Sequence, residues 1–333
     1  DAHGYDRVIP PLVEFETSMA NRMSGVATRK MFRFVDPASL RTLALRSDIT
    51  VQVGRIAATS MASAVRPLRL CYAGEVAVIA SDQLDPARQR LQLGAELIGS
   101  DSAAAAGEIV ALAIEALAAA GATGISVDFT LPDLVDTLAA GTLPLSIEAV
   151  EDVRRELDAK DAGALKAVGG ESYLPLLYAA GPFSTAVEKL ADIDAGGSLA
   201  SRIDGLRTIA ARVGDMARVT LDPAERHGFQ YQSWFGFTLF ADGVRGTLGR
   251  GGTYRLSDGE VATGFSLYID PLVDALADEP VGDLLYLPED HDRETAERMR
   301  AIGWRTIAAL GSGEDAKALG CTHRLRGSEI ESL

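Results

Sequence analysis

The stretch RPLRLCYAGEVAVIASDQLDPARQRLQLGAELIG, residues 66–99, carries the pattern that decides the fold. It predicts two strands joined by a loop, because residues 68–78 are apolar and residues 89–99 alternate between the two sides of a strand. The alternation puts Gln92 and Glu96 on one face, with Gly94 between them. We expect this glycine to leave an open floor suited to a small-ligand pocket. The alternative is the ordinary solvated face of an antiparallel sheet.

The hairpin resembles motif 2 of the class II aminoacyl-tRNA synthetases, in the form found in histidyl-tRNA synthetase and its relatives. In that family an apolar strand leads into a Gly-x-x-Phe-Arg turn, a loop and the run Arg-Gln-x-x-Gln-x-Gly-x-Glu. Ala77 and Val78 stand where the family has Phe-Arg. The resemblance implies an α+β fold with an antiparallel sheet flanked by helices. The matching residues are Tyr72, Gly74, Arg88, Gln89, Gln92, Gly94 and Glu96.

Length and composition are those of a globular protein with an acidic surface. The chain has 333 residues, of which 47% are hydrophobic and 24% charged, and this length suits roughly two domains. The formal net charge is −15, which repels nucleic acid and anionic membranes at long range. A local basic stripe could survive on such a surface, so the charge weighs only moderately against tRNA as a partner.

Cysteine usage and hydropathy indicate a cytoplasmic protein. Only Cys71 and Cys321 occur, without metal-ligand spacing or a disulfide framework. We therefore expect no metal and no cofactor. The most apolar stretch, residues 103–120, contains Glu108 and Glu115 and is too interrupted to span a bilayer. No signal peptide is recognisable, and no membrane partner is expected.

The first segment, residues 4–16, reads as an extended run that bends at two prolines. It resembles motif 1 of the same superfamily, which builds a homodimer interface and ends at a proline, here Pro11. The resemblance therefore implies that the chain pairs with itself.

A short hairpin around Asp36-Pro37, with strands at 32–35 and 42–45, leads into a helix through the segment LRSDIT, residues 45–50. Ser47 or Asp48 is a possible N-cap of that helix. The synthetases for histidine carry Leu-Arg-Pro-Glu-x-Thr here, and the acid takes the amino group of histidine. Relatives that lost aminoacylation often have Asp at this position. The resemblance therefore gives Asp48 and Thr50 a role in histidine binding.

The remaining chain predicts a core domain at residues 1–278 and a small α/β unit at 279–333. The core includes a helix at 102–120, a strand at 125–131 and a helical insertion at about 132–214, where no chemistry is visible. The tail reads β-α-β-α-β and is too short for the anticodon-binding domain of the synthetases.

Two later stretches resemble family motifs only in part. Residues 227–232 stand where the family has Arg-Gly-Leu-Asp-Tyr-Tyr, with His227 for the Arg and Tyr231 in register. Tyr231 could equally be a core aromatic residue of a sheet. Residues 248–255 resemble a Gly-Gly-Arg-Tyr-Asp turn, with Tyr254 in register, and read as a hairpin turn. Residues 262–276 resemble motif 3, with Pro271 in the place of the family's phosphate-binding Arg.

The departures from the family pattern determine the predicted function. A synthetase grips ATP with two arginines, and here Val78 and Pro271 replace them, while the loop at 79–87 supplies acids and no cation. Losing two charge-assisted contacts of ~1.5–3 kcal/mol each would weaken ATP binding by a factor on the order of 10² to 10⁴. We therefore expect a site unfavourable for a triphosphate, with no catalytic residues. The residues expected to bind histidine are Asp48, Thr50, Gln92, Glu96, Tyr231 and Tyr254.

A synthetase-like chain that keeps part of a histidine site and lacks the two ATP-binding arginines resembles the family of ATP phosphoribosyltransferase regulatory subunits. Its members make no product, and they assemble with the short catalytic subunit, typically as a hetero-octamer. They activate that subunit and confer feedback inhibition by histidine in the first step of histidine biosynthesis. Two alternatives stay open: a working histidyl-tRNA synthetase, and a histidine-binding paralogue with another partner.

Overall fold

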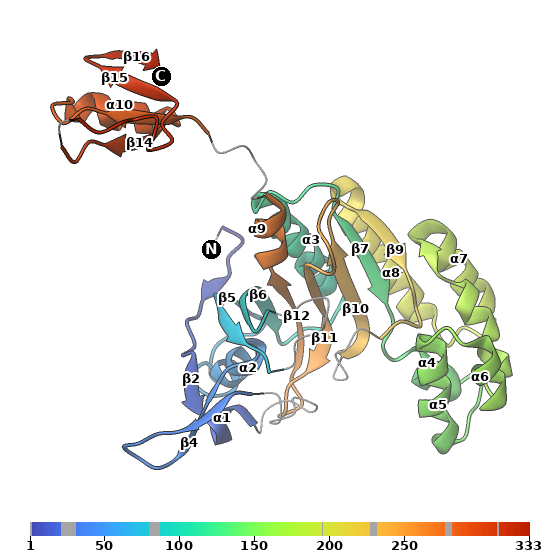
Figure 1. Ribbon diagram of the computed structural model, residues 1–333. Coiled ribbons are helices and arrows are strands. Elements are labelled where there is room, and N and C mark those ends of the chain that lie inside the picture. Colours follow the sequence, from blue (N-terminus) through green and yellow to red (C-terminus); the bar gives the residue numbers. More distant parts are fainter. Residues whose placement is uncertain are drawn as a thin grey trace. The chain divides into compact units, whose positions relative to one another are not determined.

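The computed structural model describes residues 2–20, 31–79, 87–194, 196–226, 232–276, 282–311 and 313–333. The chain divides into two compact units, Asp1–Leu276 and Ala277–Leu333, which are described separately (Figure 1). Across the described ranges, no helix is both long and apolar enough to cross a bilayer.

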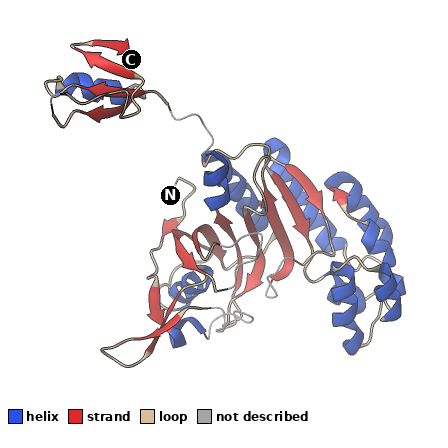
Figure 2. Cartoon of the chain, viewed as in Figure 1, coloured by secondary structure: helices blue, strands red, loops and turns tan. Residues whose placement is uncertain are grey.

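A nine-stranded sheet organises the first unit (Figure 2). Neighbouring strands are antiparallel except for the pairs β1–β5 and β7–β9. In spatial order the strands are β1 (Asp6–Arg7), β5 (Leu68–Ala77), β6 (Gln89–Ile98), β12 (Val261–Tyr268), β11 (Gly249–Arg255), β10 (Gln232–Phe240), β7 (Ser126–Thr130), β9 (Arg218–Leu221) and β8 (Gly181–Pro182).

The predicted hairpin is confirmed as β5 and β6. The two strands pair without a shift from Leu68 opposite Ile98 to Ala77 opposite Gln89. Beyond them, the Val78 amide donates to the Arg88 carbonyl at 2.8 Å, which continues the ladder toward the loop. Strand β12 then pairs with the other edge of β6, so that β6 lies inside the sheet and both of its edges are hydrogen-bonded.

Helix α3 (Ala103–Ala119) covers one face of the sheet, as the apolar pattern predicted. It begins at Ser102, whose hydroxyl accepts a hydrogen bond from the Ala105 amide at 3.2 Å, the usual arrangement of an N-cap. The helix packs against β6, β10, β11 and β12, and α8 (Ala200–Val213) lies along it. The other face is left for the polar side chains of β6.

The segment between β7 and β9 is mostly helical, as expected. Its last long helix, α8, shares the hydrophobic core of the sheet. Its other elements are α4 (Leu134–Ala139), α5 (Ile147–Asp158), α6 (Ala162–Ala167), the 3-10 helix η2 (Glu171–Tyr178), strand β8, α7 (Phe183–Ile193) and the 3-10 helix η3 (Gly214–Met216).

Near the start of the chain, a small three-stranded sheet precedes helix α2 (Thr50–Ala58). Its strand order is β2 (Val13–Phe15), β4 (Thr42–Leu45) and β3 (Arg33–Val35). The predicted hairpin around Asp36-Pro37 is therefore confirmed. A short helix, α1 (Glu16–Ala20), follows β2.

The turn expected at residues 248–255 is wrong, because residues 249–255 form the interior strand β11, with β10 and β12 on either side. Glycines lower strand propensity, yet two neighbouring strands supply hydrogen bonds that outweigh that preference. The strand and helix expected at 262–276 are found as β12 and α9 (Asp270–Leu276).

The second unit is a four-stranded sheet with one long helix. In spatial order its strands are β14 (Arg305–Ala308), β13 (Leu284–Leu287), β15 (His323–Arg326) and β16 (Glu329–Ser332). Along the chain, helix α10 (Arg293–Ala301) connects β13 to β14. The second helix of the predicted β-α-β-α-β tail is wrong, because its segment, around residues 316–320, forms turns. Strand β16 was not predicted.

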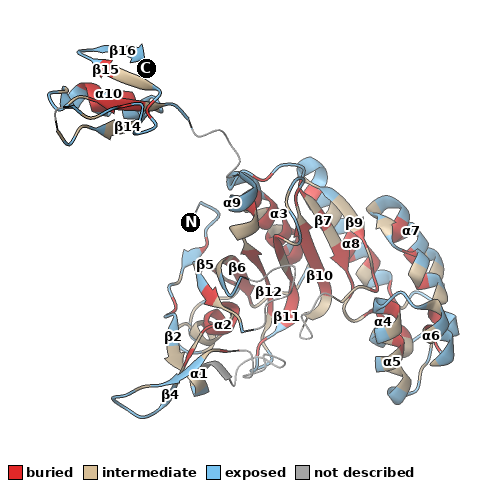
Figure 3. Ribbon diagram, viewed as in Figure 1, coloured by how far each residue is buried: buried red, intermediate tan, exposed pale blue. Residues whose placement is uncertain are grey.

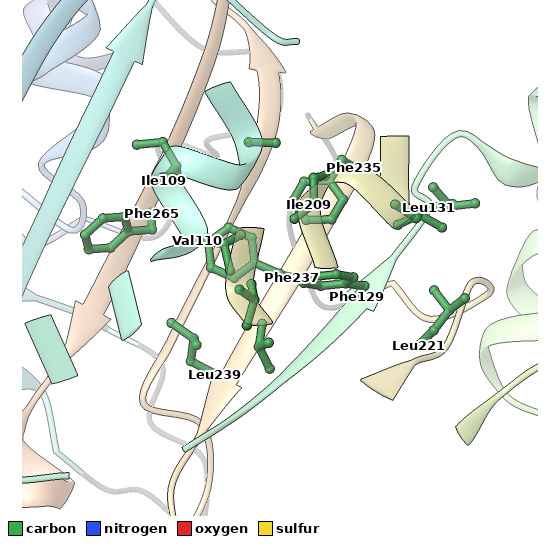
Figure 4. Packing of buried hydrophobic residues seen from close by; sticks show 14 of the residues in the cluster. Ile109, Val110, Phe129, Leu131, Ile209, Leu221, Phe235, Phe237, Leu239 and Phe265 are labelled. Carbon is green, nitrogen blue, oxygen red and sulfur yellow. The ribbon is translucent and has the colours of Figure 1, made fainter. Parts of the chain in front are cut away.

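Aromatic residues hold the centre of the first unit together, and buried residues concentrate on the sheet and α3 (Figures 3 and 4). Phe129 on β7 is fully buried and packs edge-to-face on Phe235 and Phe183, with ring centroids 5.2 and 5.9 Å apart. Aromatic pairs of this geometry add to the free energy gained from burial.

Phe129→Ala is expected to lower the free energy of unfolding by about 3–5 kcal/mol, because it removes a large buried side chain and leaves a cavity. Urea unfolding followed by circular dichroism measures the loss. Tyr178→Ala is the matched control, since Tyr178 is 70% exposed and should change stability by no more than about 0.5 kcal/mol. Equal losses in both variants would contradict this assignment of the core.

Candidate functional site

The structure brings five predicted ligand residues together on the face of the sheet opposite α3. Gln92 and Glu96 come from β6, and Tyr254 comes from β11. Asp48 and Thr50 come from the start of α2. Hydrogen bonds connect these side chains into one buried network, as follows.

Gln92 joins the sheet to the start of α2. Its amide oxygen accepts from the Ile49 backbone at 2.9 Å, and its amide nitrogen donates to Asp48 Oδ1 at 3.0 Å and Ser266 Oγ at 2.8 Å. The side chain is fully buried. Asp48 Oδ1 also accepts from the Thr50 amide at 2.8 Å. The N-cap position itself is Ile49, so Asp48 supports the first turn from one residue earlier.

Glu96 is a buried acid held by two phenols. It is 1% exposed, and it accepts from Tyr72 Oη at 3.2 Å and from Tyr254 Oη at 2.6 Å. Burial raises the pKa of Glu96 to about 8, and the charge of Asp48 adds to this shift, while the phenol hydrogen bonds oppose it. Glu96 therefore holds its proton at neutral pH until a cation comes close.

Tyr72 occupies the space over Gly94. Its hydroxyl lies 3.0 Å from Thr50 Oγ1 and 3.1 Å from Ser266 Oγ, in addition to Glu96. A Cβ at Gly94 would lie 2.3 Å from the Tyr72 hydroxyl. The expected open floor is therefore wrong: the glycine makes room for a tyrosine of the same hairpin. The spacing of Gln92 and Glu96 was read correctly, and the space between them was not.

A small cavity opens beside Glu96. It admits the centre of a water molecule over about 20 Å³, close to what one water needs. Tyr231, the sixth predicted residue, lies outside the described residues. The polar side chains that line the cavity are Thr50, Glu96, Gln232, Arg250, Tyr254 and Ser266.

Three participants were missed from the sequence. Tyr72 matched the family pattern but was given no role, and Ser266 and Arg250 were not considered. Ser266 lies two residues after Gly264, so alternation along β12 places both on the site face. Arg250 adds a cation to the cavity wall. We had expected acids and no cation near this site. Only the register of β11 and β12 reveals these neighbours.

Arg46, from the LRSDIT segment, has a structural role. It is 5% exposed, and it donates to the Pro10 carbonyl at 2.7 Å and to the Glu75 carbonyl at 2.8 Å. A Cβ at Gly74 would lie 2.1 Å from its guanidinium. The motif glycine therefore lets an arginine pass over β5 and tie the proline bend to the sheet.

Val78 and Pro271, which stand where the synthetases have ATP-binding arginines, follow the strands β5 and β12 that border the site. Val78 follows β5 and pairs through its backbone with Arg88 at 2.8 Å. Pro271 is in the first turn of α9, after Asp270, whose carboxylate accepts from the Leu91 amide at 3.0 Å. Proline suits a first helical turn, because no hydrogen-bond donor is needed there.

Comparison with known proteins identifies the family. The family model for histidyl-tRNA synthetase matches residues 1–272. The ATP phosphoribosyltransferase regulatory subunit of Rhodospirillum centenum is 40% identical over 343 aligned positions, which cover 99% of this chain and 88% of that protein. The chain belongs to the family of ATP phosphoribosyltransferase regulatory subunits. This confirms the resemblance seen in the sequence.

Solved structures of this regulatory-subunit family and of its synthetase relatives share the fold. An ATP phosphoribosyltransferase regulatory subunit/histidyl-tRNA synthetase from Bacillus halodurans superposes with a TM-score of 0.76 at 24% identity, over 96% of this chain and 88% of that one. A chain of the ATP phosphoribosyl transferase (HisG:HisZ) complex from Thermotoga maritima gives 0.63 at 16% identity, over 81% and 93%. The expected α+β, class II synthetase-like fold is confirmed.

Glu96→Gln is expected to stabilise the protein increasingly as pH rises. The pKa of Glu96 is raised from 4.5 to about 8 by folding, so the wild type loses stability between these two values, where the unfolded state is already ionised. Glutamine keeps an acceptor for the phenols and does not titrate. The difference should grow from pH 4.5 to 8 and then level off, at a few kcal/mol on the order of 1.36 kcal/mol per pKa unit.

Urea unfolding at pH 5.5, 7 and 8.5 measures this difference. Glu108→Gln is the control of opposite sign, because the hydrogen bonds from Arg69 lower the pKa of Glu108, so its removal should destabilise the protein at neutral pH. A stability difference between Glu96→Gln and wild type that stays constant with pH would contradict the assignment of a neutral buried acid.

Proposed function

We propose that the chain is a non-catalytic subunit that activates short-form ATP phosphoribosyltransferase and makes it sensitive to histidine. The observation that carries this proposal is the 40% identity over 99% of the chain to a named regulatory subunit. The partner is inferred from the relatives' name and from the complex of Thermotoga maritima, whose chain shares the fold.

The chemistry of the cavity and of the hydrogen-bond network beside it supports histidine as the effector. A carboxylate at Asp48 suits the ammonium group, and the acid of Glu96 suits the imidazole, which titrates near neutral pH. Thr50, Gln92 and Tyr254 supply polar walls, and Tyr231 remains a proposed member of the set. The cavity holds about one water as it stands, so histidine binding requires the side chains around it to move.

Loss of catalysis follows from the residues at the two arginine positions. Val78 and Pro271 offer no charge to a phosphate, and Val78 instead pairs through its backbone with Arg88. A triphosphate bound without such contacts would gain little free energy from this end of the site. The chain is therefore proposed to act through its surfaces and its ligand.

The proposed assembly is a homodimer that joins the catalytic subunit in a hetero-octamer. Apolar side chains near the start of the chain stay exposed in the single subunit, as a self-complementary interface requires. They are Leu12, Val13, Phe34 and Val35, which are 38–61% exposed. The net charge of −15 weighs against tRNA as a partner. Cys71 and Cys321 are free thiols, which suits the cytoplasm.

ATP–pyrophosphate exchange in the presence of histidine is expected to be undetectable with the purified chain, because the phosphate-gripping arginines are replaced. A genuine histidyl-tRNA synthetase assayed in parallel is the positive control. Robust exchange by this chain would refute the non-catalytic reading and favour the synthetase alternative.

Mixing the chain with short-form ATP phosphoribosyltransferase is expected to give one large complex by size-exclusion chromatography with light scattering, and a higher catalytic rate. Histidine should lower that rate, and Asp48→Asn should weaken the inhibition without dispersing the complex. Asp192→Asn, an exposed acid on α7, is the control and should behave as wild type. Two unshifted peaks with an unaltered rate would refute the assignment.

A further inference from the structure

Arg250 faces the cavity from the middle of the sheet. On β11 it lies opposite Ser266 of β12, which in turn lies opposite Gly94 of β6. Directly opposed residues of neighbouring strands project to the same face. Ser266 accepts a hydrogen bond from the Gln92 amide at 2.8 Å, so this face is the ligand face, and Arg250 lines the cavity.

Among the described residues, the cavity is lined by one acid, Glu96, and one cation, Arg250. Glu96 on β6 lies directly opposite Gly264 on β12, which lies opposite Gly252 on β11. In this row across the sheet, the two strands between β6 and β10 therefore carry no side chain. Arg250 is two residues further along the strands than that row, about 6.6 Å, and it is also two strands, about 9.6 Å, across the sheet from β6. An amino acid such as histidine, which carries both an imidazole and an α-carboxylate, suits an acid and a cation that line the same cavity from different strands.

The surroundings of Arg250 favour an additional anion. Its guanidinium is partly buried, and burial lowers its pKa, with Arg90 acting in the same direction. Tyr268 and Glu225 act in the opposite direction. Arginine remains charged in proteins and presents a planar fork that binds a carboxylate through two hydrogen bonds. A ligand carboxylate would offset both the lost solvation and the repulsion from Arg90.

We propose that Arg250 binds the α-carboxylate of the amino-acid effector and makes the site select histidine over its decarboxylated analogue. The inference rests on the proposed histidine site and assigns its selectivity for the carboxylate to a residue outside the predicted set. Asp48 and Glu96 then bind the ammonium group and the imidazole, and Arg250 binds the carboxylate, which is on the same carbon as the ammonium group.

Isothermal titration of the 333-residue chain with L-histidine and with histamine tests this assignment. Histamine keeps the imidazole and the amine and lacks the carboxylate. The wild type should prefer histidine, and Arg250→Met should weaken histidine binding roughly 10- to 100-fold, the loss of one charge-assisted contact. Its affinity for histamine should change less than about threefold. Arg250→Lys, which keeps a charge, should retain part of the preference.

Arg255→Met is the matched control. Arg255 lies on the same strand and is exposed, and it donates to the Gly259 carbonyl at 3.3 Å. This variant should bind both ligands as the wild type does. Thermal melts compared between Arg250→Met and Arg255→Met separate a loss of ligand contact from a loss of fold.

The proposed histidine site and the proposed role of Arg250 can be refuted separately. If the wild type binds histidine and Arg250→Met retains the full preference over histamine, carboxylate recognition by Arg250 is refuted and the histidine site stands. If the folded wild type binds neither ligand, alone or with the catalytic subunit, the histidine site and the role of Arg250 are both refuted.

Discussion

The buried carboxyl group of Glu96 determines which residues the neighbouring strands can carry next to it. A polar group taken out of water is costly unless hydrogen bonds replace those it loses. Tyr72 and Tyr254 supply them from two different strands, at 3.2 and 2.6 Å. Space is made by glycine, since a Cβ at Gly264 would lie 1.7 Å from Glu96 Oε2. One acid thus fixes which residues four neighbouring strands can carry at this point.

A second set of hydrogen bonds attaches α2 to the same sheet. Gln92 accepts from the Ile49 amide and donates to Asp48, which accepts in turn from the Thr50 amide. Arg46 ties the preceding residues to Pro10 and β5. The atoms proposed to recognise a ligand therefore also hold the helix. A change at Asp48 or Gln92 affects the position of α2 as well as the ligand site, and binding measurements need a stability measurement beside them.

The sequence predicted the parts of the fold that local pattern controls. Alternation placed Gln92 and Glu96 on one face, and helical spacing placed α3. Local pattern did not predict the pairing of strands that are far apart in the chain. Residues 249–255 have the glycines of a turn, and only pairing with β10 and β12 makes them a strand. Arg250 and Ser266 therefore could not be placed beside Gln92, because their register is set across strands that are more than 150 residues apart in the chain.

The role of Tyr72 escaped prediction for a different physical reason. Alternation indicates the side to which a residue points, but it does not indicate how far a neighbouring side chain reaches. The ring of Tyr72 covers Gly94 from the adjacent strand, and its hydroxyl meets Thr50, Ser266 and Glu96. An apparent gap in one strand can thus be the position of a large residue in the next.

The hydrogen-bond network around Glu96 links the proposed ligand site to several elements of the fold at once. Gln92, Glu96 and their partners hydrogen-bond to one another, burial raises the pKa of Glu96 to about 8, and the cavity has room for about one water. A cationic ligand beside Glu96 would displace some of these hydrogen bonds and lower the pKa of Glu96, so that its proton would be released to solvent. Binding is then coupled to the positions of β6, β11 and α2 at once. A ligand shifts an equilibrium only through different affinities for two states, so regulation through this site requires a second arrangement of these hydrogen bonds.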